Sequence, residues 1–414
     1  MMRANHRGGR IALRACAAAV LFSASSAFGQ AGTDALTAAF SQARGEAART
    51  AARERSVPQT PAAPLADSDD AEVRQGLHLL FKNAKCSVPE FCLNDRTEGV
   101  MVANALRFKR TFDGLARGAA PQVSWKNAGY HVKEFEFDSL IQRGVPADKV
   151  RGFVYFPQSY DKSCDLKFPA TLLIHKLGDN LDSEKQIAKL GADSDRGVVM
   201  LIYLPHFGPR KGSESFITKV PEDFERNVLQ SLLDIHQSDL ILKSVPGVKT
   251  DDIGLMGLSL GGMIALISAG IDPVFDRYGT NVGGGDLANI VTYRKSGDVD
   301  SQTGRVLKDI DWSVDQARFF LSRFDAITWS LKVKGKSIVM INAESDELVS
   351  KTLSIDPLVE GYEAAGSKVR LIMHAGTHVF HAKQVGYWDS LTKVILPMID
   401  FIGPNNFAAQ ECVR

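Results

Sequence analysis

Apolar and polar positions change their period along this chain, and the change separates two parts. Apolar side chains recur at three- and four-residue spacing within 71–84 and again within 97–117, which predicts two helices. Phe135 and Phe137 then alternate with acidic residues, which is the pattern of a half-exposed strand. Together with a second strand predicted over 150–156, this strand is expected to form an antiparallel hairpin at the edge of a sheet.

From residue 170 onward, short apolar runs alternate with stretches of helical period. This alternation predicts an α/β fold, with a mostly parallel central sheet covered by helices on both faces. Ligands in such sheets bind at the carboxyl ends of the strands. Strands are predicted over 170–174, 198–204, 253–256, 280–282, 337–341 and 369–373, and helices over 182–190, 221–242, 263–269, 287–293, 314–324, 357–365 and 383–401.

The first 29 residues have the pattern of a secretory signal peptide. Several arginines form a basic start, and an apolar stretch too short to cross a bilayer follows. Small residues, Ala27 and Gly29, then stand at the positions that a signal peptidase reads. Cleavage is expected after Gly29, which would make the mature protein periplasmic or secreted. No later apolar run reaches about 18 residues, so no membrane span is predicted.

The rest of the chain divides by composition and period. The expected segments are a low-complexity linker (30–70), an N-terminal helical extension (71–128), the α/β domain (129–403) and a C-terminal tail (404–414). Within the α/β domain, residues 286–331 are a candidate for a small cap, although their aromatic side chains also fit a structural core.

The formal net charge of +1 provides no overall field that would attract nucleic acid or an acidic membrane.

Four cysteines remain after the expected cleavage: Cys86, Cys92, Cys164 and Cys412. An even count in an exported chain suggests disulfides. Cys86 and Cys92 are close enough to close a small loop, which would leave Cys164 and Cys412 as the other pair, but three pairings are compatible with the sequence. No histidine or further cysteine stands at the usual metal-ligand spacing from these four, and no cofactor is predicted.

The segment from Asp251 to Gly270 carries the strongest chemical signal. A short apolar run suited to a buried strand leads into Gly257-x-Ser259-x-Gly261, and small apolar residues suited to a packed helix follow. Strand, sharp turn and helix form the context in which a serine is exposed at a strained backbone position. The flanking glycines provide the space that such a turn needs. Ser259 is therefore the candidate nucleophile.

A serine hydroxyl is a weak nucleophile near neutral pH, and it needs a base that an acid orients. The turn that follows the predicted strand at 337–341 contains three carboxylates. Asp346 is the preferred partner of the base, because its position matches the usual pattern at the end of such a strand. Glu344 is the alternative.

The candidate base is His378, in the loop after the predicted strand at 369–373. It stands just past Gly376, where a ring can turn toward the nucleophile. His374 is expected to end the strand, and His381 is expected to begin the last helix. Three histidines so close together could suggest a metal, but no supporting carboxylate spacing is evident.

Attack on a carbonyl also requires two backbone N–H groups that stabilise the resulting oxyanion. One is expected from Leu260, directly after the nucleophile. The other is expected from the loop 175–178, which follows the buried strand predicted from residue 170. Leu177 is the expected donor in that loop.

The elbow, the chain order Ser259, Asp346, His378 and the His175-x-x-Gly178 loop resemble the α/β-hydrolase superfamily. Their spacing is similar to that of the dienelactone-hydrolase-like and prolyl-oligopeptidase-like branches, including relatives of acetyl-xylan esterases. The resemblance covers the α/β domain and leaves out the N-terminal extension. It implies an α/β-hydrolase fold, with nucleophile, acid and base in that order and the two leucines as oxyanion donors.

One position departs from the family pattern. Many relatives have Gly directly after the loop histidine, where this chain has Lys176. Because lysine tolerates a positive φ poorly, the geometry of the second oxyanion donor is in question. The run Gly283-Gly284-Gly285 is interpreted as backbone crowding near the site, since it lacks the strand and helix context of a phosphate-binding loop.

These residues predict an exported serine hydrolase that cleaves a carboxylic ester, on a small-molecule or polymer-borne substrate, through an acyl-enzyme on Ser259. A serine peptidase of the prolyl-oligopeptidase type is the alternative, although a propeller of that family is missing from the sequence. A non-catalytic binding protein with the same fold is the second alternative.

Overall fold

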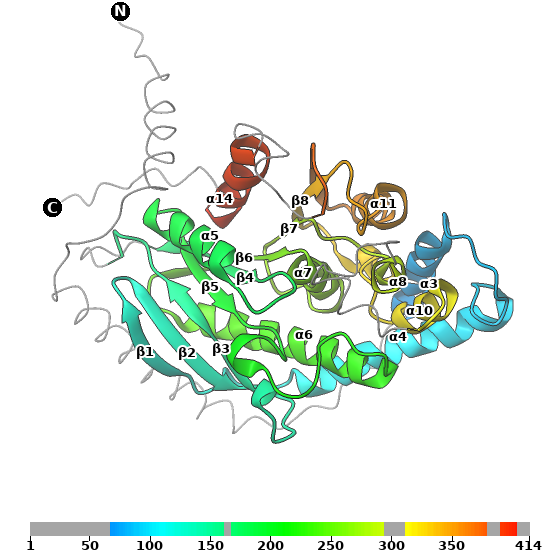
Figure 1. Cartoon of the computed structure of the whole chain (residues 1–414), viewed down its shortest axis with the longest axis horizontal. Coiled ribbons are helices and arrows are strands. Elements are labelled where there is room, and N and C mark those ends of the chain that lie inside the picture. The colour runs from blue at the N-terminus through cyan, green and yellow to red at the C-terminus, as the bar shows by residue number, and fades with distance from the viewer. Residues whose placement is uncertain (1–66, 161–166, 294–310, 379–389, 404–414) are drawn as a thin grey trace, which may run out of the picture.

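The computed structural model describes residues 67–160, 167–293, 311–378 and 390–403. Within them, a sheet of nine strands lies between helices on its two faces (Figure 1). The segment interpreted as a signal peptide, most of the expected linker and the C-terminal tail lie outside the described residues. The same holds for Cys164, His381 and Cys412.

The sheet is antiparallel at one end and parallel through the rest. Strands β1, β2 and β3 pair antiparallel, and β3 pairs antiparallel with β5, whereas all pairings from β5 to β9 are parallel. The central strands are buried along their length, as parallel strands covered on both faces must be. Across the sheet the order is β1 (Ser124–Gly129), β2 (Val132–Asp138), β3 (Lys149–Tyr155), β5 (Val198–Ile202), β4 (Phe168–Ile174), β6 (Val248–Leu258), β7 (Arg277–Asn281), β8 (Ser337–Ala343) and β9 (Lys368–His374).

Helices cover the two faces of the sheet unequally. The face beneath α5 and α14 packs a smaller core cluster around Leu173 and Met256. The other face packs a larger cluster, to which α6 and α7 contribute most of their buried side chains. The helices after the extension are α5 (Asp182–Asp193), α6 (Pro221–Ser244), α7 (Leu260–Ile271), α8 (Leu287–Thr292), α10 (Val314–Leu321), α11 (Asp356–Ala364) and α14 (Leu396–Ile402). Short 3₁₀ or π turns are η1 (Pro146–Asp148), η2 (Gly208–Arg210), η3 (Ser330–Lys332), η4 (Lys351–Ile355) and η5 (Ser390–Ile395).

The N-terminal extension packs on this α/β unit as two helices, α3 (Asp67–Phe81) and α4 (Asp95–Leu115). Their buried side chains belong to the same large core cluster as those of α6 and α7. Asn94 caps α4, because its side-chain oxygen accepts the first free backbone N–H groups of the helix. The first helix begins at Asp67, four residues before the predicted boundary and inside the expected linker.

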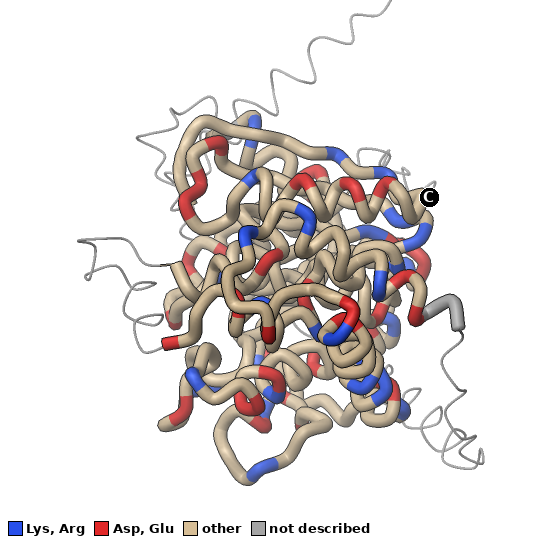
Figure 2. The backbone as a smooth tube through the Cα atoms, turned by 90° about the vertical axis from the view of Figure 1, so that its right-hand side faces the viewer, with Lys and Arg blue, Asp and Glu red and all other residues tan. Residues whose placement is uncertain are grey.

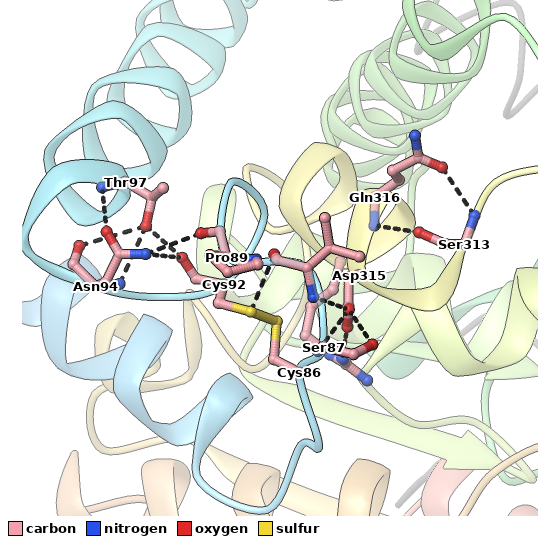
Figure 3. Close-up of a disulfide and its surroundings, with 11 residues drawn as sticks. Cys86, Ser87, Pro89, Cys92, Asn94, Thr97, Ser313, Asp315 and Gln316 are labelled. Carbon is pink, nitrogen blue, oxygen red and sulfur yellow. Dashed lines mark hydrogen bonds and ion pairs between the residues drawn. A yellow bond between two sulfur atoms is a disulfide. The ribbon is translucent and has the colours of Figure 1, made fainter.

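A disulfide closes the loop between the two helices of the extension (Figure 3). It joins Cys86 to Cys92, one of the pairings that the sequence left open. The carboxylate of Asp315, in α10, accepts hydrogen bonds from the N–H groups of Ser87 and Val88, at 2.8 and 3.0 Å. The extension is therefore attached to the segment in which the sequence suggested a cap.

One strand was missed by the hydrophobic pattern. The hairpin predicted at the edge of the sheet is present as β2 and β3, but β1 lies outside it and forms the edge. Five of the six residues of β1 are exposed, so apolar and polar side chains do not alternate along it. The long helix expected over 383–401 is described only from Ser390, where a π turn leads into α14.

Basic and acidic residues are interspersed along the backbone, in agreement with the small net charge (Figure 2). Among the described residues, no helix has the length and apolar character that crossing a membrane requires.

Candidate active site

Ser259 lies on a sharp turn between β6 and α7. Its φ is 49° and its ψ is −113°, a strained conformation for a residue with a side chain. The turn depends on the flanking glycines: a Cβ added to Gly257 would lie 2.0 Å from the carbonyl oxygen of Gly261. The N–H of Ser259 donates to the carbonyl of Asn281 at 2.8 Å, which ties the turn to the end of β7.

The three side chains that the sequence selected lie together at the carboxyl edge of the sheet. The hydroxyl oxygen of Ser259 is 2.7 Å from Nε2 of His378. Nδ1 of His378 is 2.9 and 3.1 Å from the two carboxylate oxygens of Asp346. The Asp346 side chain is 1% exposed and the His378 side chain 11% exposed, so water has little access to the bonds between them.

Backbone N–H groups hold the Asp346 carboxylate, and backbone contacts join its loop to the loop that carries His378. One carboxylate oxygen of Asp346 accepts the N–H groups of Leu348 and Val349, at 2.9 and 2.8 Å. The acidic turn also pairs with the histidine loop, since the N–H of Ser345 donates to the carbonyl of Gly376 at 3.0 Å. Glu344, the alternative acid, is exposed and contributes a backbone N–H to this pairing, not a carboxylate to the imidazole.

A serine on a strand–turn–helix elbow, followed in the chain by its acid and then its histidine, at the carboxyl edge of a mostly parallel sheet, is a distinctive combination. The protein has the α/β-hydrolase fold.

Solved structures that are similar to this chain include esterases and a peptidase. An acetyl xylan esterase from a Thermoanaerobacterium species is 15% identical, with a TM-score of 0.49 over 71% of this chain and 93% of that one. An acetyl xylan esterase from a Paenibacillus species is 14% identical, with a TM-score of 0.46 over 81% and 99%. An acylaminoacyl peptidase from Pyrococcus horikoshii is 15% identical, with a TM-score of 0.46 over 67% of this chain and 40% of that one.

No family model and no curated protein matches the sequence. At these identities and TM-scores, the similar structures provide no argument about the activity of this α/β-hydrolase-fold protein.

The loop expected to supply an oxyanion donor adopts a conformation that lysine accepts. Lys176 does not have a positive φ, so the departure from the family pattern does not strain the backbone there. The turn is made two residues later, at Gly178, whose φ is 120°. The N–H groups of Leu177 and Leu260 donate to no other group within the described part of the chain. Both are thus available to an oxyanion.

His175, at the start of this loop, is a residue whose role the sequence did not reveal. Its Nδ1 lies 2.5 Å from the carbonyl of Lys176, and its Nε2 accepts the N–H of Leu204 at 2.9 Å. A carbonyl only accepts, so Nδ1 carries the proton and the ring is neutral. Complete burial favours the neutral form and lowers the pKa of His175 to about 4. Its position directly after a buried strand was the signal that the sequence offered.

The glycine run is crowded, since a Cβ on Gly283 would lie 2.9 Å from backbone of Gly262, at the start of α7. Within the candidate cap, Phe324 and Trp329 are 1% exposed and belong to the core. Residues 294–310 lie outside the described residues.

Among the described residues of the structure, a single group of three side chains brings potential metal-ligand atoms close together, and it consists of Cys86, Cys92 and Asp315. Both sulfurs are engaged in the disulfide, so neither is a thiolate that could bind an ion.

Proposed function

We propose that this protein is a serine hydrolase that cleaves a carboxylic ester. The observation that carries the proposal is the continuous chain of contacts from the Ser259 hydroxyl through the His378 imidazole to the Asp346 carboxylate. Each group plays the part that a nucleophile, its base and an orienting acid need.

The first half of the reaction forms an acyl-enzyme. The hydroxyl oxygen of Ser259 attacks the ester carbonyl while Nε2 of His378 takes the hydroxyl proton. Asp346 holds Nδ1–H and stabilises the imidazolium. The oxyanion accepts the N–H groups of Leu177 and Leu260. The C–O bond to the alcohol then breaks, and the alcohol leaves with the proton from Nε2.

The second half returns the enzyme. A water molecule gives a proton to Nε2 of His378 and attacks the acyl carbon. The same two N–H groups stabilise the second oxyanion. When the bond between the acyl carbon and Ser259 breaks, the proton returns to the hydroxyl and the carboxylic acid is released. Every proton is accounted for by the imidazole, so the reaction needs no cofactor.

Export of the protein belongs to the same proposal. Residues 1–29 would be removed as a signal peptide, which leaves the enzyme in the periplasm or outside the cell. The disulfide between Cys86 and Cys92 fits an oxidising compartment.

Replacing the nucleophile tests the proposal. Ser259→Ala should lower the kcat for p-nitrophenyl acetate by at least about 10⁴-fold, and a fluorophosphonate probe should label the wild type but not the variant. Ser244→Ala, at the far end of α6, is the matched control and should hydrolyse and label as the wild type does. Hydrolysis that persists in Ser259→Ala contradicts the assignment. Faster turnover of aminoacyl-p-nitroanilides than of esters would replace the esterase with a peptidase.

A further inference from the structure

The buried carboxylate of Glu184 binds Lys176, the residue just before the expected oxyanion donor. Glu184 is the third residue of α5, and its side chain is 0% exposed. One of its oxygens accepts the backbone N–H of Lys176 at 3.1 Å. Its two oxygens also lie 3.1 and 3.0 Å from Nζ of the same lysine. Lys176 is thus held at both its backbone and its side-chain end.

Placing a charged carboxylate in the protein interior is costly unless it is paired and hydrogen-bonded. Glu184 meets both conditions through Lys176, and it lies in the first turn of α5, where the helix dipole favours a negative charge. The backbone N–H that it accepts comes from the loop, not from its own helix. The carboxylate therefore stabilises one conformation of the loop.

The histidine of the loop fixes the next peptide. His175 holds the carbonyl of Lys176, and the peptide plane that contains this carbonyl also contains the N–H of Leu177. In a trans peptide the two groups point in opposite directions, so this contact turns the Leu177 N–H away from the imidazole. With Glu184 on one peptide plane and His175 on the other, both dihedral angles of Lys176 are fixed.

The fixed loop lies against the nucleophile elbow. A Cβ added to Gly261 would lie 2.4 and 2.5 Å from the carbonyl oxygens of Ile174 and His175. The loop therefore starts in contact with the first turn of α7, two residues beyond Ser259. A rotation at Lys176 would move the Leu177 N–H relative to the hydroxyl of Ser259 without unfolding either element.

We propose that Glu184 is a positioning residue for the oxyanion hole. It makes no contact with the reacting atoms; it holds Lys176 so that the N–H of Leu177 is aligned before substrate arrives. The hydrogen bond from the Lys176 N–H to the Glu184 carboxylate restrains the backbone of the loop. This restraint sets the direction of the Leu177 N–H. The inference rests on the proposed serine hydrolase, because an oxyanion forms only in that reaction.

The test separates the backbone contact from the ion pair. Glu184→Ala removes the acceptor of the Lys176 N–H, and should lower kcat about 100-fold while KM changes less than about twofold. The double variant Glu184→Gln with Lys176→Met keeps an oxygen acceptor for that N–H and removes both charges. Its kcat should stay within about threefold of the wild type.

A transition-state readout distinguishes positioning from simple support of the fold. A phenylboronic acid forms a tetrahedral adduct on a serine nucleophile, and its Ki should rise in Glu184→Ala by the same factor as kcat/KM falls. Asp315→Ala is the matched control. Like Glu184, Asp315 lies in the first turn of a helix and accepts backbone N–H groups of a loop. This variant should lower the unfolding midpoint and leave kcat and Ki unchanged.

Three results would overturn the inference. Glu184→Ala could retain the wild-type kcat, the double variant could be as slow as Glu184→Ala, or Asp315→Ala could lose kcat equally. If the wild type itself hydrolyses no ester in a Ser259-dependent manner, the proposed function fails first, and the inference fails with it.

Discussion

Two loops of this protein are each held by a carboxylate that accepts backbone N–H groups, but the two contacts stabilise different parts of the molecule. In the loop that starts at His175, Glu184 accepts the N–H of Lys176. In the disulfide loop, Asp315 accepts the N–H groups of Ser87 and Val88 (Figure 3). Both acids stand in the first turn of a helix, where the dipole favours their charge.

The difference lies in what surrounds each acid. Glu184 has its charge partner on the loop that it holds, at the rim of the candidate active site. Asp315 holds a loop that is also closed by a covalent bond. Three residues further along α10, Arg318 makes a buried ion pair with Asp286, with both nitrogen–oxygen distances at 3.2 Å. The contact of Glu184 sets the direction of one N–H. The contacts of Asp315 attach the extension to the helices after β7.

The largest effect is expected at His175. His175→Phe keeps an aromatic ring but leaves the Lys176 carbonyl and the buried Leu204 N–H without partners, at a cost of about 2–4 kcal/mol in the free energy of unfolding. The kcat for an ester should fall at least about 100-fold, because the Leu177 N–H is no longer aligned. Urea unfolding and steady-state kinetics measure the two effects. Lost stability with unchanged kcat would show that the two loops serve the same purpose, and the comparison would fail.

Acid should weaken the two loops in different pH windows. The folded pKa of His175 is about 4, below its ordinary value of 6.5, so between these values the unfolded chain binds a proton that the folded chain does not. The contribution of His175 is therefore complete above pH 6.5 and is lost as pH falls toward 4, by about 3 kcal/mol in total.

Asp315 also loses its contribution as pH falls, but in a lower pH window. Burial alone would raise its pKa, but the hydrogen bonds from Ser87 and Val88 outweigh burial and hold the pKa below 3.8. Its contribution is lost only below that value. Unfolding midpoints from pH 7 to 3 for the wild type, His175→Phe and Asp315→Ala resolve the two windows. A difference between wild type and His175→Phe that stays constant from pH 7 to 4 would contradict the assignment of His175 as neutral.

The smallest effect is expected from the disulfide. Replacing Cys86 and Cys92 by serine opens a loop of seven residues, which should cost about 2 kcal/mol of unfolding free energy. The kcat should not change, since the loop contacts the extension and α10. Wild-type protein treated with dithiothreitol should show the same lowered midpoint. A loss of kcat comparable with that of Glu184→Ala would mean that the extension shapes the site.

The sequence was most informative where the chemistry is local. The elbow at Ser259 could be found because strand, turn and helix follow one another, and Asp346 and His378 follow predicted strands whose carboxyl ends must share one edge. The apolar runs of the central strands predicted the sheet for the same reason. Most boundaries differ from the expected ones by a few residues, because caps and frayed turns are set by contacts and not by the pattern alone.

Contacts between distant positions left no comparable signal. Asp315 is 228 residues from Ser87, and neither residue type in isolation indicates the other. The hydrogen bond between Lys176 and Glu184 joins residues eight positions apart, one in a loop and the other at the start of a helix, where no periodicity applies. The concern about Lys176 came from assuming that the positive φ must follow the histidine directly, whereas the chain places it at Gly178.

The position of the disulfide in the chain also has a consequence for the order of assembly. Cys86 and Cys92 are six positions apart, so once the exported chain reaches an oxidising compartment their sulfurs can meet before any distant segment has folded. Asp315, in α10, lies 228 residues beyond Ser87. The ring can therefore close first, and α10 can then dock onto a loop of restricted conformation.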